Sequence, residues 1–271
     1  MFKEVKLFFK EYPPKETAIL TTPILILHGL FGSSKNWVSV SEFLSNYSKV
    51  YSLDLRNHGD SPHSSEHSLS AMAEDVKEFL EDHGLNKVIL LGHSMGGLVA
   101  MTFSLRYPEK VEDLIIQDIA PRDYEFKYEG ELAVLRTDLS NFKNRQEIDA
   151  ASSKYVSNPF IRNFLLMNLD RTESGQYRWK LNVDAISRSK NMFRSEFSGA
   201  DRQYSGNVMF IIGGISEYFH TSDKIVCLEY FPNAKFKTIP GGDHYIHFTK
   251  ADEFRKILTE FMDSIVSGRE K

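Results

Sequence analysis

Cysteine is almost missing from this chain of 271 residues, because Cys227 is the only one. A single cysteine cannot form an internal disulfide, and it cannot supply the ligands of a cysteine-based zinc site. The sequence also lacks the H-E-x-x-H pattern of zinc hydrolases and the full G-x-G-x-x-G spacing of a dinucleotide site. We therefore expect neither a metal nor an organic cofactor.

An excess of charge of one sign is also missing, and so are long apolar runs. The 33 Lys and Arg residues and 37 Asp and Glu residues give a formal net charge of -4, so no basic field is expected to attract nucleic acid. No apolar run is long enough to cross a bilayer, and residues 1–10 lack the apolar segment of a secretory signal. We expect a cytoplasmic protein that acts on a small molecule without stable membrane insertion. The sequence leaves its oligomeric state open.

What the sequence does contain is an alternation of strand-like and helix-like segments. Hydrophobic residues make up 41% of the chain, which is enough for a large core. Near-continuous apolar runs at residues 24–27, 50–53 and 88–91 predict strands buried on both faces, as in a parallel sheet. Residues 69–83 place their apolar side chains on one helical face, so the pattern indicates βαβ units.

The two ends of the chain give weaker signals. Segments 5–9 and 17–20, on either side of Tyr12-Pro13-Pro14, predict an antiparallel hairpin. Near the other end, Thr249 and Asp252 have the spacing of a capping box that would begin the last helix.

Residues 122–203 differ from the rest, because they are charged, helix-like in patches and poor in continuous β-type runs. The βα pattern resumes at residues 208–212. We interpret residues 122–203 as an inserted helical cap, and residues 1–121 and 204–271 as an α/β core. The predicted core is a mostly parallel central sheet flanked by helices, interrupted after about its sixth strand.

The strongest local motif is Gly92-His93-Ser94-Met95-Gly96, which follows a predicted strand and begins a predicted helix. This G-x-S-x-G pattern is typical of a tight strand-to-helix turn that exposes a nucleophilic serine. Gly92 and Gly96 suit such a turn, because side chains at these positions would collide. The motif predicts Ser94 as a nucleophile.

An oxyanion formed at Ser94 would need two backbone N–H donors. In this type of turn one donor is the residue after the serine, here Met95, and the other comes from the loop after an earlier strand. Residues 28–32 form that loop, and we expect Leu30 to donate, with Phe31 as second choice. Four residues beside these donors are expected to contact the substrate: His28, Gly29, Phe31 and His93.

The general base is expected late in the chain, where the order serine, acid, histidine places it. His244 follows a predicted strand and precedes the last helix, with His247 as its competitor. The acid usually follows the strand at residues 208–212, but Ser216 stands there instead, one residue before Glu217. The spacing therefore leaves the acid open.

Four segments in this order resemble the capped bacterial carboxylesterases of the α/β-hydrolase fold, a family similar to mitochondrial abhydrolase-domain proteins. They are HGLFGSSKNW (28–37), DLRNHGDSP (54–62), GHSMGG (92–97) and DIAP (118–121). The resemblance covers about residues 3–266 and is weakest in the cap. It implies esterase and thioesterase activity, including hydrolysis of acyl-CoA, with a mobile helical cap and no cofactor.

The resemblance also implies which residue is the acid. It places the acid after the strand that precedes the cap, at Asp118, and leaves Glu217 and then Asp184 as alternatives. The family usually has asparagine where Ile215 stands, so the loop after residues 208–212 departs from its pattern.

We therefore predict a serine hydrolase that cleaves carboxylic esters and acyl thioesters through Ser94, His244 and Asp118, with an acyl-enzyme intermediate. One alternative is a cofactor-free haloperoxidase that uses the same residues, and another is a non-catalytic ligand-binding module. Apolar cap residues are expected either to line the substrate pocket or to pack within the cap: Phe126, Tyr128, Phe160, Phe164, Leu165 and Met167.

The charged loop at residues 54–62 is interpreted differently, as a structural anchor after a core strand. His63 and His67 have the spacing of helical metal ligands, but Pro62 and the serines around them indicate a loop. A zinc site is therefore not expected there.

Overall fold

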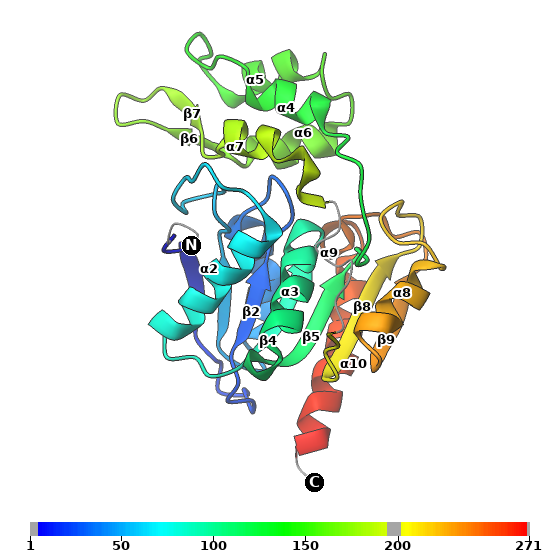
Figure 1. Ribbon diagram of the computed structural model, residues 1–271. Helices are drawn as coiled ribbons and strands as arrows, with labels where there is room; N and C mark the ends of the chain where they lie inside the picture. Colours follow the sequence, from blue (N-terminus) through cyan, green and yellow to red (C-terminus); the bar gives the residue numbers. More distant parts are fainter. Residues whose placement is uncertain (1–4, 194–201, 270–271) are drawn as a thin grey trace.

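A seven-stranded sheet runs through the part of the chain that the structure describes, which is residues 5–193 and 202–269 of a computed structural model (Figure 1). Its strand order is β1-β3-β2-β4-β5-β8-β9, and every neighbouring pair is parallel except β1 with β3. The sheet is therefore mostly parallel, as predicted. The strands are β1 (Phe9–Tyr12), β2 (Ile24–Leu27), β3 (Val50–Leu53), β4 (Val88–His93), β5 (Val111–Gln117), β8 (Asn207–Gly213) and β9 (Ala234–Ile239).

Helices cover both faces of this sheet because its central strands are apolar on both sides. On β2, Leu25 and Leu27 belong to one buried cluster with the helices α2, α3 and α8, whereas Ile24 and Ile26 belong to a second cluster with α1 and α10. Alternate side chains of a strand point to opposite faces, so each face has its own core. The helices are α1 (Val38–Leu44), α2 (Leu69–Asp82), α3 (Met95–Arg106), α8 (Asp223–Tyr230) and α10 (Ala251–Arg269), with short 3-10 turns at Ser34–Trp37 and Pro108–Lys110.

Helix α2 shows how local signals fix these boundaries. The Ser68 side chain accepts a hydrogen bond from the backbone N–H of Ala71 and caps the first turn. The helix ends before Gly84, which has a φ of 63° that suits glycine. Its predicted apolar face is buried against the sheet.

The segment between β5 and β8 lies over the carboxyl ends of the strands (Figure 1). It contains α4 (Glu129–Leu135), α5 (Arg145–Ser152), α6 (Pro159–Leu166), α7 (Val183–Arg188) and a 3-10 turn (Lys190–Phe193). It also contains an antiparallel hairpin of β6 (Leu169–Arg171) and β7 (Tyr177–Trp179), which the sequence analysis did not predict. The hairpin escapes sequence inspection because each strand has only three partly exposed residues.

The insertion follows β5, the fifth strand, rather than a sixth. The exact limits of the cap, residues 122 and 203, stay a prediction, and the second limit lies close to residues outside the described ranges.

Two expectations for the chain ends are wrong. Residues 17–20 form no strand, and β1 pairs with β3 across the sheet instead of forming a local hairpin. The strand stops at Tyr12 because Pro13 and Pro14 lack the N–H groups that would continue it. Thr249 does not cap the last helix: it ends α9 (Ile246–Thr249), and its hydroxyl donates to Asp243 at 2.7 Å.

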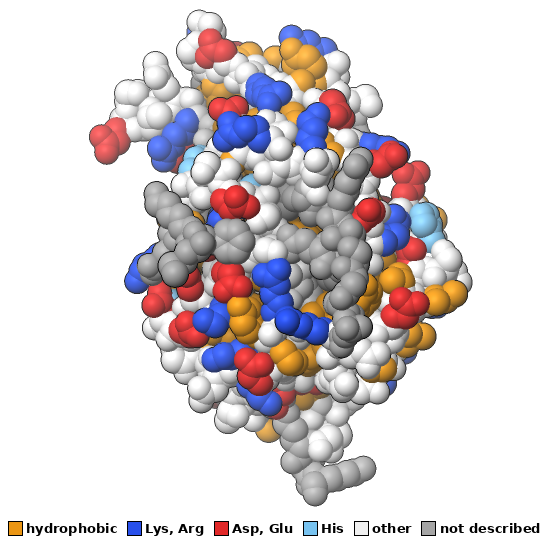
Figure 2. Space-filling view, in the orientation of Figure 1, with side chains coloured by type: hydrophobic (Ala, Val, Ile, Leu, Met, Phe, Trp, Pro, Cys, Tyr) orange, Lys and Arg blue, Asp and Glu red, His pale blue; other side chains and the backbone are white. Residues whose placement is uncertain are grey.

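Acidic and basic side chains are interspersed over the face shown in Figure 2, on the cap and on the core alike. None of the described helices combines the length and the apolar character that crossing a bilayer requires.

Candidate active site

Ser94 lies in the turn between β4 and α3, at the carboxyl edge of the sheet. Its φ of 53° and ψ of -121° are unusual for a residue with a side chain. A Cβ atom on Gly92 would lie 2.3 Å from the carbonyl oxygen of Gly96, and one on Gly96 would lie 2.4 Å from that of Leu27. The turn therefore requires glycine on both sides of the strained serine, as the motif predicted.

Asp118 occupies the equivalent position after the neighbouring strand β5. It too has a positive φ, 54°, and its carboxylate is buried. One carboxylate oxygen accepts a hydrogen bond from His244 Nδ1 at 2.7 Å and another from the Ser216 hydroxyl, while the second oxygen accepts from the backbone N–H of Gly213 at 2.8 Å. The side chain is thus held by three partners.

The two alternative acids lie elsewhere. Glu217 is exposed and lines an outer hollow together with Arg122 and Lys127. Asp184 is exposed in the first turn of α7, within the cap. The carboxylate that contacts His244 is that of Asp118, so the geometry favours Asp118 as the acid.

His244 lies in the loop between β9 and α9. Its ring stacks on that of Tyr218, with centroids 3.8 Å apart and planes 23° apart. The Tyr218 hydroxyl in turn hydrogen-bonds the Tyr128 hydroxyl at 2.9 Å, which joins this wall to the cap. His244 and Ser94 line the same cavity, although they are 150 residues apart in sequence.

The other two histidines nearby have supporting positions. His247 is buried, stacks on Trp37 with centroids 4.4 Å apart, and hydrogen-bonds the Gln117 side chain at 2.8 Å. His93 bonds the backbone carbonyl of His244 through Nε2 at 3.0 Å. Burial lowers the pKa of His247 to about 3 and that of His93 well below its usual value, so both rings stay neutral at neutral pH. They hold the loop of His244 in place.

The loop after β2 packs directly on the serine turn. A Cβ atom on Gly29 would lie 2.9 Å from His93 Nδ1 and 3.2 Å from Ser94 Cβ. The backbone N–H of Phe31 faces His58 Nε2 at 3.3 Å, whereas the N–H of Leu30 has no acceptor among the described residues. This difference favours Leu30 over Phe31 as the oxyanion donor. Met95 is the first residue of α3, where backbone N–H groups have no partner within the helix.

Three of the four residues expected to contact the substrate, Gly29, Phe31 and His93, line the cavity at Ser94. His28 does not. It is buried, with Nδ1 bonded to the carbonyl of Gly29 at 2.8 Å and Nε2 accepting from the backbone N–H of Leu55 at 2.9 Å. His28 therefore connects two loops instead of contacting the cavity. The position of His28 in the motif does not predict this role.

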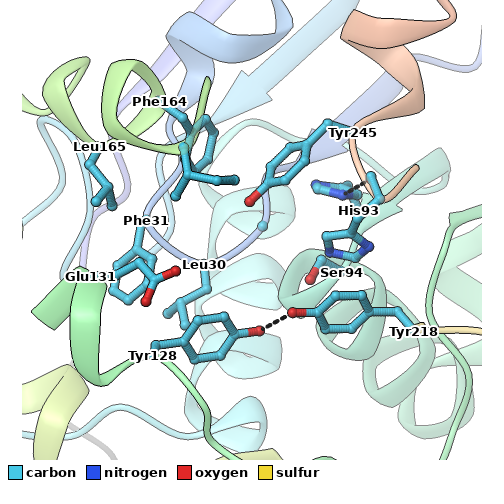
Figure 3. Close-up of a pocket in the computed structure, with 13 residues that line it drawn as sticks. Leu30, Phe31, His93, Ser94, Tyr128, Glu131, Phe164, Leu165, Tyr218 and Tyr245 are labelled. Atoms are coloured by element: carbon cyan, nitrogen blue, oxygen red, sulfur yellow. Dashed lines mark hydrogen bonds between the residues drawn. The ribbon is translucent and has the colours of Figure 1, made fainter. Parts of the chain in front are cut away.

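The cap covers this cavity (Figure 3). Of the six apolar cap candidates, Tyr128, Phe164 and Leu165 line it. Phe160 and Met167 line a separate surface groove, and Phe126 packs edge-on against Tyr128. The space left free at Ser94 is only about 20 Å³, enough for one water molecule.

Sequence inspection missed several residues of the site. Ser216 carried the only usable signal, since it stands where most α/β-hydrolases have the acid and supports Asp118 from there. The others come from four separate segments that only folding brings together, and their positions in the sequence are unremarkable: Glu131, Ile161, Tyr218 and Tyr245.

The loop at residues 54–62 forms a second buried polar cluster at the same edge of the sheet. Asp54 accepts hydrogen bonds from the backbone N–H groups of Ser34, at 2.6 Å, and Asp60, at 2.8 Å. Arg56 forms two hydrogen bonds of 2.6 Å with Asp75 on α2. These contacts agree with the interpretation of this loop as an anchor.

The candidate metal ligands of this region do not converge. His63 bonds the backbone carbonyl of Lys180, and His67 contacts the Asn57 side chain. Among the described residues, no group of three or more His, Cys, Asp or Glu side chains is arranged to hold a metal ion.

A mostly parallel sheet, a strained serine between strand and helix, and a His–Asp pair at the carboxyl edge together define the class of α/β-hydrolases. The model of the alpha/beta hydrolase fold family matches residues 22–251, and the chain belongs to this family.

Similar proteins bear the names of esterases and lipases. The chain is 34% identical over 248 residues to mouse "sn-1-specific diacylglycerol lipase ABHD11", covering 88% of this chain and 80% of that protein. It is 28% identical over 245 residues to "Esterase YbfF" of Escherichia coli, covering 89% and 93%. A solved "Marine microorganism esterase" is 38% identical, with a TM-score of 0.89 and coverage of 95% and 100%. The chain is therefore a hydrolase of the α/β fold with esterase-like and lipase-like relatives.

Proposed function

We propose that this protein is a serine esterase that also accepts acyl thioesters, including acyl-CoA. The observation that carries the proposal is the 2.7 Å hydrogen bond between Asp118 and His244 beside a cavity that Ser94 also lines. The names of the relatives support the same reaction class.

In the proposed mechanism, His244 Nδ1 carries a proton and donates it to the hydrogen bond with Asp118, so that Nε2 is free to accept. His244 takes the proton of Ser94 while the serine oxygen attacks the acyl carbonyl. The alcohol or thiol leaves with that proton, and water then releases the acyl group from Ser94 by the same steps. Asp118 orients the imidazole and stabilises its cationic form without taking the proton.

The negative charge that develops on the carbonyl oxygen would be stabilised by the backbone N–H groups of Met95 and Leu30. The loss of one such donor typically costs about 3 to 4 kcal/mol of transition-state stabilisation. The Leu30 N–H supports this assignment, because it has no acceptor in the described part of the chain.

The walls of the cavity favour an apolar acyl or alcohol group. Phe31, Ile161, Phe164 and Leu165 line the cavity with apolar side chains. Because the free space holds only about one water molecule, with a volume of about 20 Å³, an ester must displace cap side chains to reach Ser94. We therefore expect the cap to set the substrate range.

The decisive experiment compares the wild type with Ser94→Ala, using Ser174→Ala on the exposed turn of the β6–β7 hairpin as control. Ser94→Ala should lower kcat for p-nitrophenyl esters and acyl-CoA by about a million-fold and should abolish labelling by a fluorophosphonate probe. The control should retain both. Ester hydrolysis that persists in Ser94→Ala would remove Ser94 from the mechanism.

The same preparation separates the alternatives. A wild-type protein that forms no fluorophosphonate adduct on Ser94 would support a ligand-binding module. Bromide oxidation with peroxide, in the absence of ester hydrolysis, would support a haloperoxidase.

A further inference from the structure

One carboxylate from the cap points into the cavity at Ser94. Glu131 lies in the first turn of α4 and lines the cavity together with Ser94 and His244. Figure 3 shows its carboxylate directed into the cavity beside Tyr128, across the cavity from Ser94. Among the described residues that line this space, it is the only acidic one.

Nothing in the described part of the chain neutralises this carboxylate. Within that part, no cation forms an ion pair with Glu131 and no other side chain hydrogen-bonds it; its own backbone N–H is the one donor to it. The side chain is about half-buried, and burial raises the pKa of its carboxyl group. A half-buried carboxylate with so few partners is stabilised by a hydrogen-bond donor that a ligand supplies.

The surroundings of Glu131 define what such a ligand would carry. Burial is the main cause of the raised pKa values of Tyr128, Tyr218 and Tyr245, which line the same cavity, and the charge of the Glu131 carboxylate raises them further. Apart from Ser94 and two histidines, the other lining residues are apolar or glycine. A substrate anion would therefore face a negative charge and no Lys or Arg among the described lining residues, whereas a hydroxyl group would find an acceptor.

We propose that Glu131 is a specificity-determining residue that selects esters bearing a neutral hydrogen-bond donor, such as a free hydroxyl group, and rejects esters bearing a carboxylate. The inference rests on the proposed esterase function, because it concerns the substrate of the same cavity. The cap would then select substrates by their charge as well as by their size.

A different role for Glu131 would be to stabilise the first turn of α4 through the helix dipole. Glu129 occupies the same turn and provides the matched control. It is exposed, pairs with Lys190 at 3.1 Å and does not line the cavity. Glu131→Gln and Glu129→Gln each remove one negative charge from this turn, but only the first changes the charge of the cavity.

The experiment measures kcat/KM for four alkyl esters with the wild type and both variants. Ethyl butyrate is the reference, and monoethyl succinate places a carboxylate in the acyl part. 2-Hydroxyethyl butyrate and carboxymethyl butyrate place a hydroxyl or a carboxylate in the alcohol part. Because a carboxylate is tested in each part of the ester, the outcome is informative whichever part lies against Glu131.

With Glu131→Gln we expect kcat/KM for one of the two carboxylate esters to rise about tenfold relative to ethyl butyrate. The kcat/KM for 2-hydroxyethyl butyrate should fall relative to ethyl butyrate. Glu129→Gln should leave every ratio unchanged. Each effect is a ratio to the reference ester measured with the same variant, so damage that lowers all four rates alike cancels, and Glu129→Gln should also keep its kcat for the reference ester.

Two failures are distinguishable. If both variants hydrolyse all four esters with the wild-type ratios, the role of Glu131 is refuted while the esterase function stands. If the wild type hydrolyses none of them and Ser94 takes no fluorophosphonate, the proposed function fails, and the inference fails with it.

Discussion

Two buried polar clusters lie at the same edge of the sheet, and they contain similar residues but differ in their expected roles. One consists of Asp118, Ser216 and His244, and we call it the cavity cluster. The other consists of Asp54, Arg56 and Asp75, and we call it the anchor cluster. Both contain carboxylates that accept several hydrogen bonds, and both include residues of loops that follow core strands.

The difference lies in what each cluster faces. The cavity cluster ends in His244, which lines the space at Ser94, whereas Arg56 and Asp75 are almost completely buried against each other. A polar group can take part in a reaction only where a substrate can reach it, and a fully enclosed ion pair contributes to structure alone. Substitutions in the two clusters should therefore separate activity from stability.

The largest effect is expected for Asp118→Asn in the cavity cluster. The neutral amide would no longer hold His244 in the required tautomer or stabilise the imidazolium, so kcat should fall about ten-thousand-fold, which is about 5 kcal/mol in activation free energy. Steady-state hydrolysis of a p-nitrophenyl ester measures this, with Glu217→Gln as the control that keeps its activity. The opposite result, a loss in Glu217→Gln alone, would move the acid to the usual loop.

In the anchor cluster, Asp75→Asn should act on stability. It leaves the Arg56 guanidinium buried without its ionic partner, which should lower the free energy of unfolding by about 3 to 5 kcal/mol. Urea denaturation measures this change, and active-site titration should give an unchanged kcat per folded molecule. A reduced kcat without loss of stability would show that this loop takes part in the reaction. The two clusters would then not differ in function as proposed.

A smaller effect is expected for Ser216→Ala, which removes one hydrogen bond from Asp118 but leaves those from His244 and Gly213. We expect kcat to fall about tenfold, since one hydrogen bond to a charged group contributes about 1.5 to 3 kcal/mol and part of this is recovered by relaxation. The pH dependence of kcat should shift at the same time, because Asp118 acts through His244. An unchanged rate and pH profile would mean that Ser216 only fills space.

The smallest effect is expected for Lys180→Ala, which removes an ion pair between the cap and Asp60 in the loop of the anchor cluster. Asp60 is partly exposed to solvent, so the loss should be below about 1 kcal/mol in unfolding free energy. Thermal denaturation in low and high salt would detect it. A loss of several kcal/mol would instead make this contact a main attachment of the cap.

The motifs predicted the parts of the site that depend on local geometry. The strand-to-helix turn at Ser94 is confirmed, since its two glycines are required by contacts within a few residues or with the adjacent strand. The βα order and the mostly parallel sheet are confirmed too, because apolar runs reveal strands buried on both faces. The roles of Ser94, His244 and Asp118 in catalysis stay predictions.

Other features of the fold and the site could not be predicted from the sequence. The strand at Phe9–Tyr12 is defined by its pairing with β3, and the β6–β7 hairpin by contacts of two three-residue strands. His28 and Phe31 belong to one loop motif, yet only Phe31 reaches the cavity, because both nitrogens of His28 are used by backbone groups. Side-chain direction in a loop depends on neighbours that are distant in sequence.

By itself, then, the sequence determined the α/β pattern, the strained serine turn and the small set of residues able to act as base and acid. Only the tertiary structure decided that His244 rather than His247 meets Asp118, and that Glu131 enters the cavity from the cap. The physical reason is that periodicity and glycine geometry are properties of short segments, whereas hydrogen bonds and charges in a cavity join segments that only folding brings together.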